Sequence, residues 1–132
     1  MRASTEVQTQ TPRARILIAD DEAHVREMLR HFLTREGYLV SAVEDGRGVL
    51  DTVSTFQPDV IVVDMVMPGL TGADVLTALR RAGVTVPIIL ISAYDIVVRE
   101  GFFAVLTKPF NLRALADTVA AAVDQGRATT GA

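Results

Sequence analysis

Residues 60–69 read VIVVDMVMPG, and the first four of them form an unbroken apolar run that ends at an aspartate, Asp64. A strand with one face in water alternates apolar and polar residues, whereas a strand covered on both faces is apolar throughout. This stretch therefore predicts a buried strand of a parallel sheet that carries a carboxylate at its carboxyl end.

Four further apolar runs are short enough to be strands. They are ILIA at 16–19, YLVSAV at 38–43, VPIILIS at 86–92 and FFAVL at 102–106. The mixed composition of YLVSAV favours an edge strand, while the other runs are nearly continuous. Apolar residues at helical spacing occupy the segments between most runs, and the clearest stripe extends from Leu112 to Val123, with Asn111 as its predicted N-cap.

Regular alternation of strand and helix predicts an α/β domain. Because crossovers between parallel strands are right-handed, five strands favour a doubly wound, flavodoxin-like parallel sheet in the order 2-1-3-4-5. The fourth crossover is cramped, since its helix has to fit between Ser92 and the last strand. We expect this fourth helix, within residues 94–100, to be short or irregular.

Length and composition limit the class of protein. The 132 residues fit one domain, predicted at 13–125, between flexible tails at 1–12 and 126–132. The chain has no cysteine, a net charge of −3 and 49% hydrophobic residues, which excludes thiolate metal sites and disfavours disorder and nucleic-acid partners. With neither a membrane-length apolar run nor a signal peptide, we expect a cytoplasmic protein without a membrane partner.

Polar side chains follow the predicted strands where parallel strands share one edge, the place at which such sheets bind ligands. Asp20 and Asp21 follow the first strand, Asp64 the third, Ser92 the fourth and Lys108 the fifth. Neighbouring strands lie about 4.8 Å apart, so Asp20 or Asp21 should approach Asp64 closely enough to share a cation.

The residue types indicate phosphoryl chemistry. Carboxylates packed together repel one another, and a hard divalent ion such as Mg²⁺ suits a site with carboxylates, waters and a phosphate. Asp64 would then attack phosphorus to form an acyl phosphate, while Lys108 and Ser92 hold phosphoryl oxygens. Lys108 is the only lysine in a chain with twelve arginines, which supports a role that needs a compact ammonium group.

The segments ILIADDE, VIVVDMVMPG, ILISA and LTKPF resemble the receiver domain of bacterial two-component response regulators, in particular the single-domain, CheY-like members, over about residues 15–125. The resemblance implies that Asp64 is the phospho-acceptor and that Mg²⁺ is held by Asp20, Asp21, Asp64 and the main-chain carbonyl of Val66. It also implies that Ser92 is the switch hydroxyl, that Lys108 contacts the phosphoryl group, and that the bond before Pro109 is often cis.

The same resemblance implies the partners. A sensor histidine kinase or a phosphotransfer protein would supply the phosphoryl group, and a downstream protein that the sequence does not identify would receive the signal by contact or by onward phosphotransfer. Catalysis would be limited to the chain's own phosphorylation and slow dephosphorylation. The chain departs from the family at Val105, where an aromatic residue is usual. Strand alternation predicts that Phe103 shares the face of Val105 and that Phe102 does not.

Val66 and Tyr94 take the positions that border the attacking water in the family, and neither orients water well, so we expect a long-lived acyl phosphate. Two other functions remain open at this point. A receiver-like interaction module could act without phosphorylation, which the aliphatic Val105 and the short fourth crossover favour. A flavin- or nucleotide-binding enzyme of the same fold would need a phosphate-binding loop after the first strand, where ADDEAHV instead offers carboxylates.

Overall fold

The computed structural model describes residues 11–93 and 100–131. Within them, parallel strands form one sheet in the order β2-β1-β3-β4-β5, which confirms the predicted flavodoxin-like topology. The strands are β1 (Arg15–Ala19), β2 (Leu39–Val43), β3 (Val60–Asp64), β4 (Ile88–Ser92) and β5 (Ala104–Thr107). All five residues of β3 are buried, as its continuous apolar sequence predicts.

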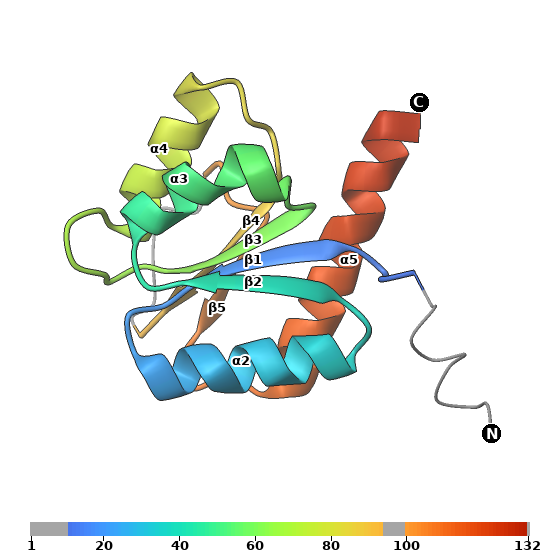
Figure 1. Cartoon of the computed structure of the whole chain (residues 1–132), viewed down its shortest axis with the longest axis horizontal. Helices are drawn as coiled ribbons and strands as arrows, with labels where there is room; N and C mark the ends of the chain where they lie inside the picture. The colour runs from blue at the N-terminus through green and yellow to red at the C-terminus, as the bar shows by residue number, and fades with distance from the viewer. Residues whose placement is uncertain (1–10, 94–99, 132) are drawn as a thin grey trace.

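Helices cover both faces of the sheet (Figure 1). They are α2 (Ala23–Arg35), α3 (Gly46–Phe56), α4 (Gly72–Arg81) and α5 (Leu112–Gly131). Helices α2 and α5 lie on one face, and α3 and α4 lie on the other (Figure 1). No helix in the described part of the chain combines the length and the apolar character of a membrane span.

The core consists of two aliphatic layers separated by the sheet. In β1, Ile16 and Ile18 pack into the layer beneath α2 and α5, while Leu17 and Ala19 pack into the layer beneath α3 and α4. Successive side chains of a strand point to opposite faces, so a strand between two helical layers is apolar at every position. The two layers hold the strand ends in fixed positions, which matters for the side chains that follow them.

Local capping interactions set the helix boundaries. The Asn111 Oδ1 atom accepts a hydrogen bond from the Ala114 amide at 2.6 Å, which confirms the predicted N-cap of α5. Thr71 and Asp74 form a reciprocal capping box at the start of α4. Gly37 follows α2 with φ +100°, a backbone conformation that glycine adopts without the steric penalty of a Cβ atom.

Helix α5 continues to Gly131, although residues 126–132 are predicted to form a flexible tail. That prediction rested on the polar, aperiodic sequence GRATTGA, but a helix needs no apolar stripe in its exposed last turns and a single glycine inside it costs only about 1 kcal/mol. Tertiary contacts offset this amount: Val123 is buried, and the Arg127 guanidinium donates a hydrogen bond to the Arg13 carbonyl. Most of the predicted N-terminal tail (residues 1–12) and of the predicted fourth helix (within residues 94–100) lies at residues 1–10 and 94–99, outside the described residues.

The two phenylalanines before β5 are placed opposite to the prediction. Phe102 packs with Val105 in the layer beneath α3 and α4, and Phe103 packs in the layer beneath α2 and α5. Strand alternation does not apply here, because β5 begins only at Ala104 and the chain bends at Phe103. Phe102 is therefore the aromatic side chain that shares the layer of Val105.

Gly126→Ala is expected to raise the free energy of unfolding by about 1 kcal/mol, measured by urea denaturation. A Cβ atom at residue 126 would meet no atom within 4 Å, so the substitution adds helix propensity without a clash. Gly83→Ala is the opposite control: its site is equally open, but φ is +82°, and the variant should lose about 1 kcal/mol. An unchanged stability for Gly126→Ala would show that residue 126 is not helical in solution.

Candidate functional site

The carboxyl ends of four strands bring the predicted site residues to one edge of the sheet. Asp20 follows β1, Asp64 is the last residue of β3, Ser92 is the last residue of β4, and Lys108 follows β5. The register pairs Ala19 with Val63, so Asp20 and Asp64 occupy neighbouring positions on adjacent strands. The sheet order alone therefore gathers residues that are up to 88 positions apart in the sequence.

Three carboxylates form a compact cluster at this edge. Oxygens of Asp20, Asp21 and Asp64 all lie within 4.8 Å of one another. Asp20 and Asp64 are 1% and 6% exposed, whereas Asp21 is open to solvent. Two carboxylates thus line the buried floor of the cluster and one lies at its rim, an arrangement that suits a hard cation retaining some of its water ligands.

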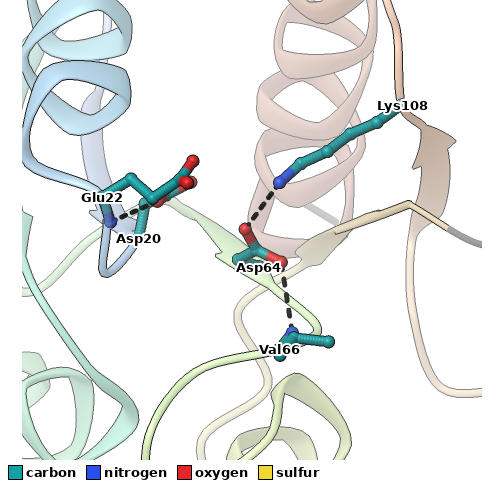
Figure 2. Close-up of polar contacts among 5 residues, drawn as sticks. All are labelled: Asp20, Glu22, Asp64, Val66 and Lys108. Atoms are coloured by element: carbon teal, nitrogen blue, oxygen red, sulfur yellow. Dashed lines mark hydrogen bonds and ion pairs between the residues drawn. The ribbon is translucent and has the colours of Figure 1, made fainter.

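The electrostatics of the cluster also favour a cation. Burial raises the pKa of Asp20, and the neighbouring charge of Asp64 raises it further. A hydrogen bond of 2.9 Å from the Glu22 amide to Asp20 Oδ1 acts in the opposite direction and offsets only part of this rise (Figure 2). The folded protein therefore holds negative charge here against its desolvation, and a divalent ion with oxygen ligands would remove that penalty.

Lys108 provides the positive charge of the site. Its Nζ atom donates to Asp64 Oδ2 at 2.8 Å, reaching toward that carboxylate from beyond the end of β5 (Figure 2). Partial burial acts to lower the pKa of Lys108, but the hydrogen bond to Asp64 and the charges of Asp64, Asp20 and Glu22 outweigh it and raise the pKa. Lys108 therefore remains an ammonium group.

The main chain fixes the position of this lysine. The Lys108 amide donates to the Ser92 carbonyl at 2.7 Å, which continues the β4–β5 pairing past the end of the strand. The peptide bond between Lys108 and Pro109 is cis, as the resemblance implied. Ser92 itself is 1% exposed, one position beyond the residue that pairs with Asp64.

The second oxygen of Asp64 is bound by the loop that follows β3. The Val66 amide donates to Asp64 Oδ1 at 3.1 Å, while the Val66 side chain is 62% exposed beside the site (Figure 2). Both carboxylate oxygens of Asp64 therefore have donors, one from a charged side chain and one from the backbone. These two contacts fix the carboxylate orientation at the centre of the cluster.

Two positioning residues were not found from the sequence. The Arg26 Nη1 atom donates to the Asp20 carbonyl at 2.7 Å and ties the turn after β1 to helix α2. The Gly72 amide donates to Met65 O at 3.0 Å, and a Cβ atom there would lie 2.5 Å from Leu90 Cδ1 and 3.1 Å from Asp64 O. Apolar spacing assigns no role to either residue. The only signal in the sequence is that Gly72, a poor helix former, stands just before the apolar stripe of the predicted helix.

Residues 16–120 match the family described as Response regulator receiver domain. The chain belongs to this family. A receiver domain is a signalling module rather than an ordinary enzyme. The Asp20, Asp21 and Asp64 cluster is typical of the Mg²⁺-binding site of receivers.

Curated relatives include the alkaline phosphatase synthesis transcriptional regulatory protein SphR of Synechococcus elongatus, 38% identical over 80% of this chain and 47% of that protein. Another is the response regulator MprA of Mycolicibacterium vanbaalenii, 40% identical over 76% of this chain and 46% of that protein. The chain thus spans about half the length of these relatives.

Solved receiver structures agree with the fold. The receiver domain of Francisella response regulator 1452 is 29% identical, with a TM-score of 0.80 over 85% of this chain and 98% of that one. The response regulator TrrA of Thermotoga maritima, solved in complex with Mg²⁺ and BeF, is 30% identical, with a TM-score of 0.75 over 82% of this chain and 97% of that one.

Asp20→Asn should stabilise the protein in the absence of divalent ions by about 1 kcal/mol, because it removes a desolvated charge beside Asp64. The asparagine can still accept the Glu22 amide. Adding Mg²⁺ should raise the melting temperature of the wild type and raise that of Asp20→Asn much less. Equal Mg²⁺-induced shifts in the two proteins would contradict a metal site that includes Asp20.

Proposed function

We propose that this receiver accepts a phosphoryl group on Asp64 from a histidine kinase or a phosphotransfer protein in a Mg²⁺-dependent reaction. The observation that carries the proposal is the Asp64 carboxylate, buried within the acidic cluster and held at 2.8 Å by the only lysine of the chain. A buried carboxylate oriented by two donors at the mouth of a cation site has the features of an oriented nucleophile.

The proposed metal ligands are Asp20, Asp21, Asp64 and the main-chain carbonyl of Val66. The mutual distances of the three carboxylates support the first three. When bound, Mg²⁺ would neutralise charge that develops on the transferring phosphoryl oxygens. The residues of the chain contribute position and charge: Asp64 supplies the nucleophilic oxygen, and Lys108 supplies a fixed ammonium group beside it.

In the transfer step, an Asp64 oxygen bonds to phosphorus while the bond from phosphorus to the imidazole nitrogen of the donor histidine breaks. The electron pair of that bond stays on the nitrogen, and the product is an acyl phosphate on Asp64. Lys108 then exchanges its contact with the carboxylate for one with a phosphoryl oxygen, and the Ser92 hydroxyl binds another. These exchanges are the local change that favours the signalling conformation.

The downstream step is proposed to be protein contact or onward phosphotransfer. Val105 on the edge strand β5 is half-buried and aliphatic, so the aromatic side-chain movement usual for the family has no side chain to act on at that position. Phe102, which packs in the same layer, is the aromatic residue available to couple β5 to α4. A net charge of −3 disfavours nucleic acid or an anionic membrane as the partner, which leaves a protein.

Incubation with Mg²⁺ and a small phosphodonor such as acetyl phosphate should add one phosphoryl group to the wild type, read by intact mass. Asp64→Asn should gain none, because its amide oxygen is not a competent nucleophile. Asp51→Asn, which removes an exposed aspartate from α3, is the matched control and should be phosphorylated like the wild type. Withholding Mg²⁺ should abolish the mass gain in every variant.

The same experiment distinguishes the alternative of an interaction module that acts without phosphorylation. The aliphatic Val105 favours that alternative, because it leaves the usual aromatic switch of the family without its residue. A folded wild type that gains no phosphate from the phosphodonor or from a histidine kinase would support it. Phosphorylation that persists in Asp64→Asn would reject Asp64 as the acceptor.

The acyl phosphate is expected to be long-lived. The Val66 side chain is exposed beside Asp64 and offers no polar group to orient an attacking water; Tyr94, the second residue of this prediction, lies outside the described residues. Val66→Asn should speed loss of the phosphate about fivefold, the effect of one hydrogen bond of about 1 kcal/mol. The decay is followed by intact mass after removal of the donor, with Val66→Leu as the apolar control. A wild-type half-life of seconds would contradict this prediction.

A further inference from the structure

A cavity lies at the opposite edge of the sheet from the acidic cluster. Its volume is about 580 Å³, and its walls are formed where the chain enters β3, β4 and β5 and by residues 123–127 of α5. The lining includes Asp59, residues 85–87, residues 101–103 and Gly126. Sites for metabolite-sized ligands have volumes of about 300–1,000 Å³, so the cavity is of the right size for such a ligand.

Two guanidinium groups line this cavity without an acidic partner. Arg80 donates from Nη1 to the Val84 carbonyl at 2.8 Å, and Arg127 donates to the Arg13 carbonyl. Among the side chains of residues 11–93 and 100–127, neither arginine forms an ion pair with a carboxylate. Burial lowers the pKa of Arg80, with no neighbouring acid to oppose the shift, so its charge is partly desolvated and uncompensated.

The one carboxylate of the lining is already engaged. Asp59 Oδ2 accepts the Arg15 amide hydrogen at 2.8 Å, which fixes the loop between α3 and β3. The cavity therefore presents two guanidinium groups against one carboxylate, and each guanidinium has further N–H donors beyond its hydrogen bond to a main-chain carbonyl. Such forked donors match the geometry of a carboxylate or a phosphate.

The rest of the lining is mixed, with a cluster of apolar side chains. Val86, Pro87, Phe102, Phe103 and Val123 line the cavity beside the polar residues Thr85 and Gln125, and two of the apolar side chains are aromatic. Gly126 adds no side chain, and a Cβ atom there would meet nothing within 4 Å, so the cavity keeps its room on the side of α5. An apolar lining with a few convergent polar groups is the usual character of a small-molecule site.

We propose that this cavity binds an organic anion of metabolite size, whose carboxylate or phosphate pairs with Arg80 and Arg127 and whose aromatic or apolar body packs against Phe102 and Phe103. The cavity is separate from the acidic cluster, and the proposal does not depend on phosphorylation of Asp64. It rests on the volume of the cavity, its two guanidinium groups without a carboxylate partner among the described residues, and its apolar side chains.

The test uses the full ¹⁵N-labelled chain without Mg²⁺ and follows amide shifts during titration. Phenyl phosphate and benzoate combine an anion with an aromatic body, inorganic phosphate is the anion alone, and benzyl alcohol is the body alone. Phenyl phosphate, benzoate or both should give saturable shifts at residues 85–87, 101–103 and 123–127. Each effective probe should bind about tenfold more tightly than inorganic phosphate or benzyl alcohol. If phenyl phosphate binds more tightly than benzoate, the site prefers a phosphate; the reverse order indicates a carboxylate.

Arg80→Gln and Arg127→Gln should each weaken the stronger probe about tenfold, the loss of one charge-assisted hydrogen bond. Arg81→Gln removes the same charge from the adjacent exposed position of α4 and should bind like the wild type. Arg127 is exposed, so its variant decides the question if Arg80→Gln fails to fold. Absence of saturable shifts with both aromatic anions, or equal affinities in Arg81→Gln and Arg127→Gln, would overturn the proposal.

Discussion

The repulsion between buried carboxylates on two adjacent strands is the interaction on which the site depends. Parallel pairing of β1 with β3 places Asp20 beside Asp64 at the edge of the sheet, and both side chains are almost fully buried. The two carboxylates stay close together because both lie at the ends of strands that are packed on two faces. The fold thus maintains a local excess of negative charge, which Lys108 neutralises only in part.

This excess of negative charge is useful for binding because the carboxylates that carry it lie on rigid strands. A site of fixed carboxylates reorganises little when a cation and a phosphoryl group arrive, so their binding energy can be used to move the surrounding loops. The Asp64 carboxylate has donors on both oxygens, one from Lys108 at the end of β5 and one from the loop before α4. A group added to Asp64 must therefore rearrange contacts with two separate elements at once.

Most of the site was predictable because sheet order and strand ends are encoded by simple patterns. Continuous apolar runs fix the strands, and the polar residue after each run falls at the shared edge, which is how Asp20, Asp64 and Lys108 were found. Gly72 is needed because it lies too close to Leu90 and to the Asp64 main chain for a Cβ atom. Sequence periodicity gives no information on such a distance. Phe103 was misplaced because a bend before β5 breaks the alternation. The helical course of residues 126–131 was missed because their polar sequence carries no apolar periodicity.

The two edges of the sheet use different cationic side chains, in a chain with twelve arginines and one lysine. At the amino edge, Arg13 donates to the carbonyl that ends α2, Arg15 to the last carbonyl of α3, and Arg80 to a carbonyl just after α4. A planar fork suits these helix ends, where several carbonyls lack partners and the dipole is negative. At the carboxyl edge a single compact ammonium group, that of Lys108, faces the Asp64 carboxylate from a flexible stem, which takes less room beside the acidic cluster than a planar fork would.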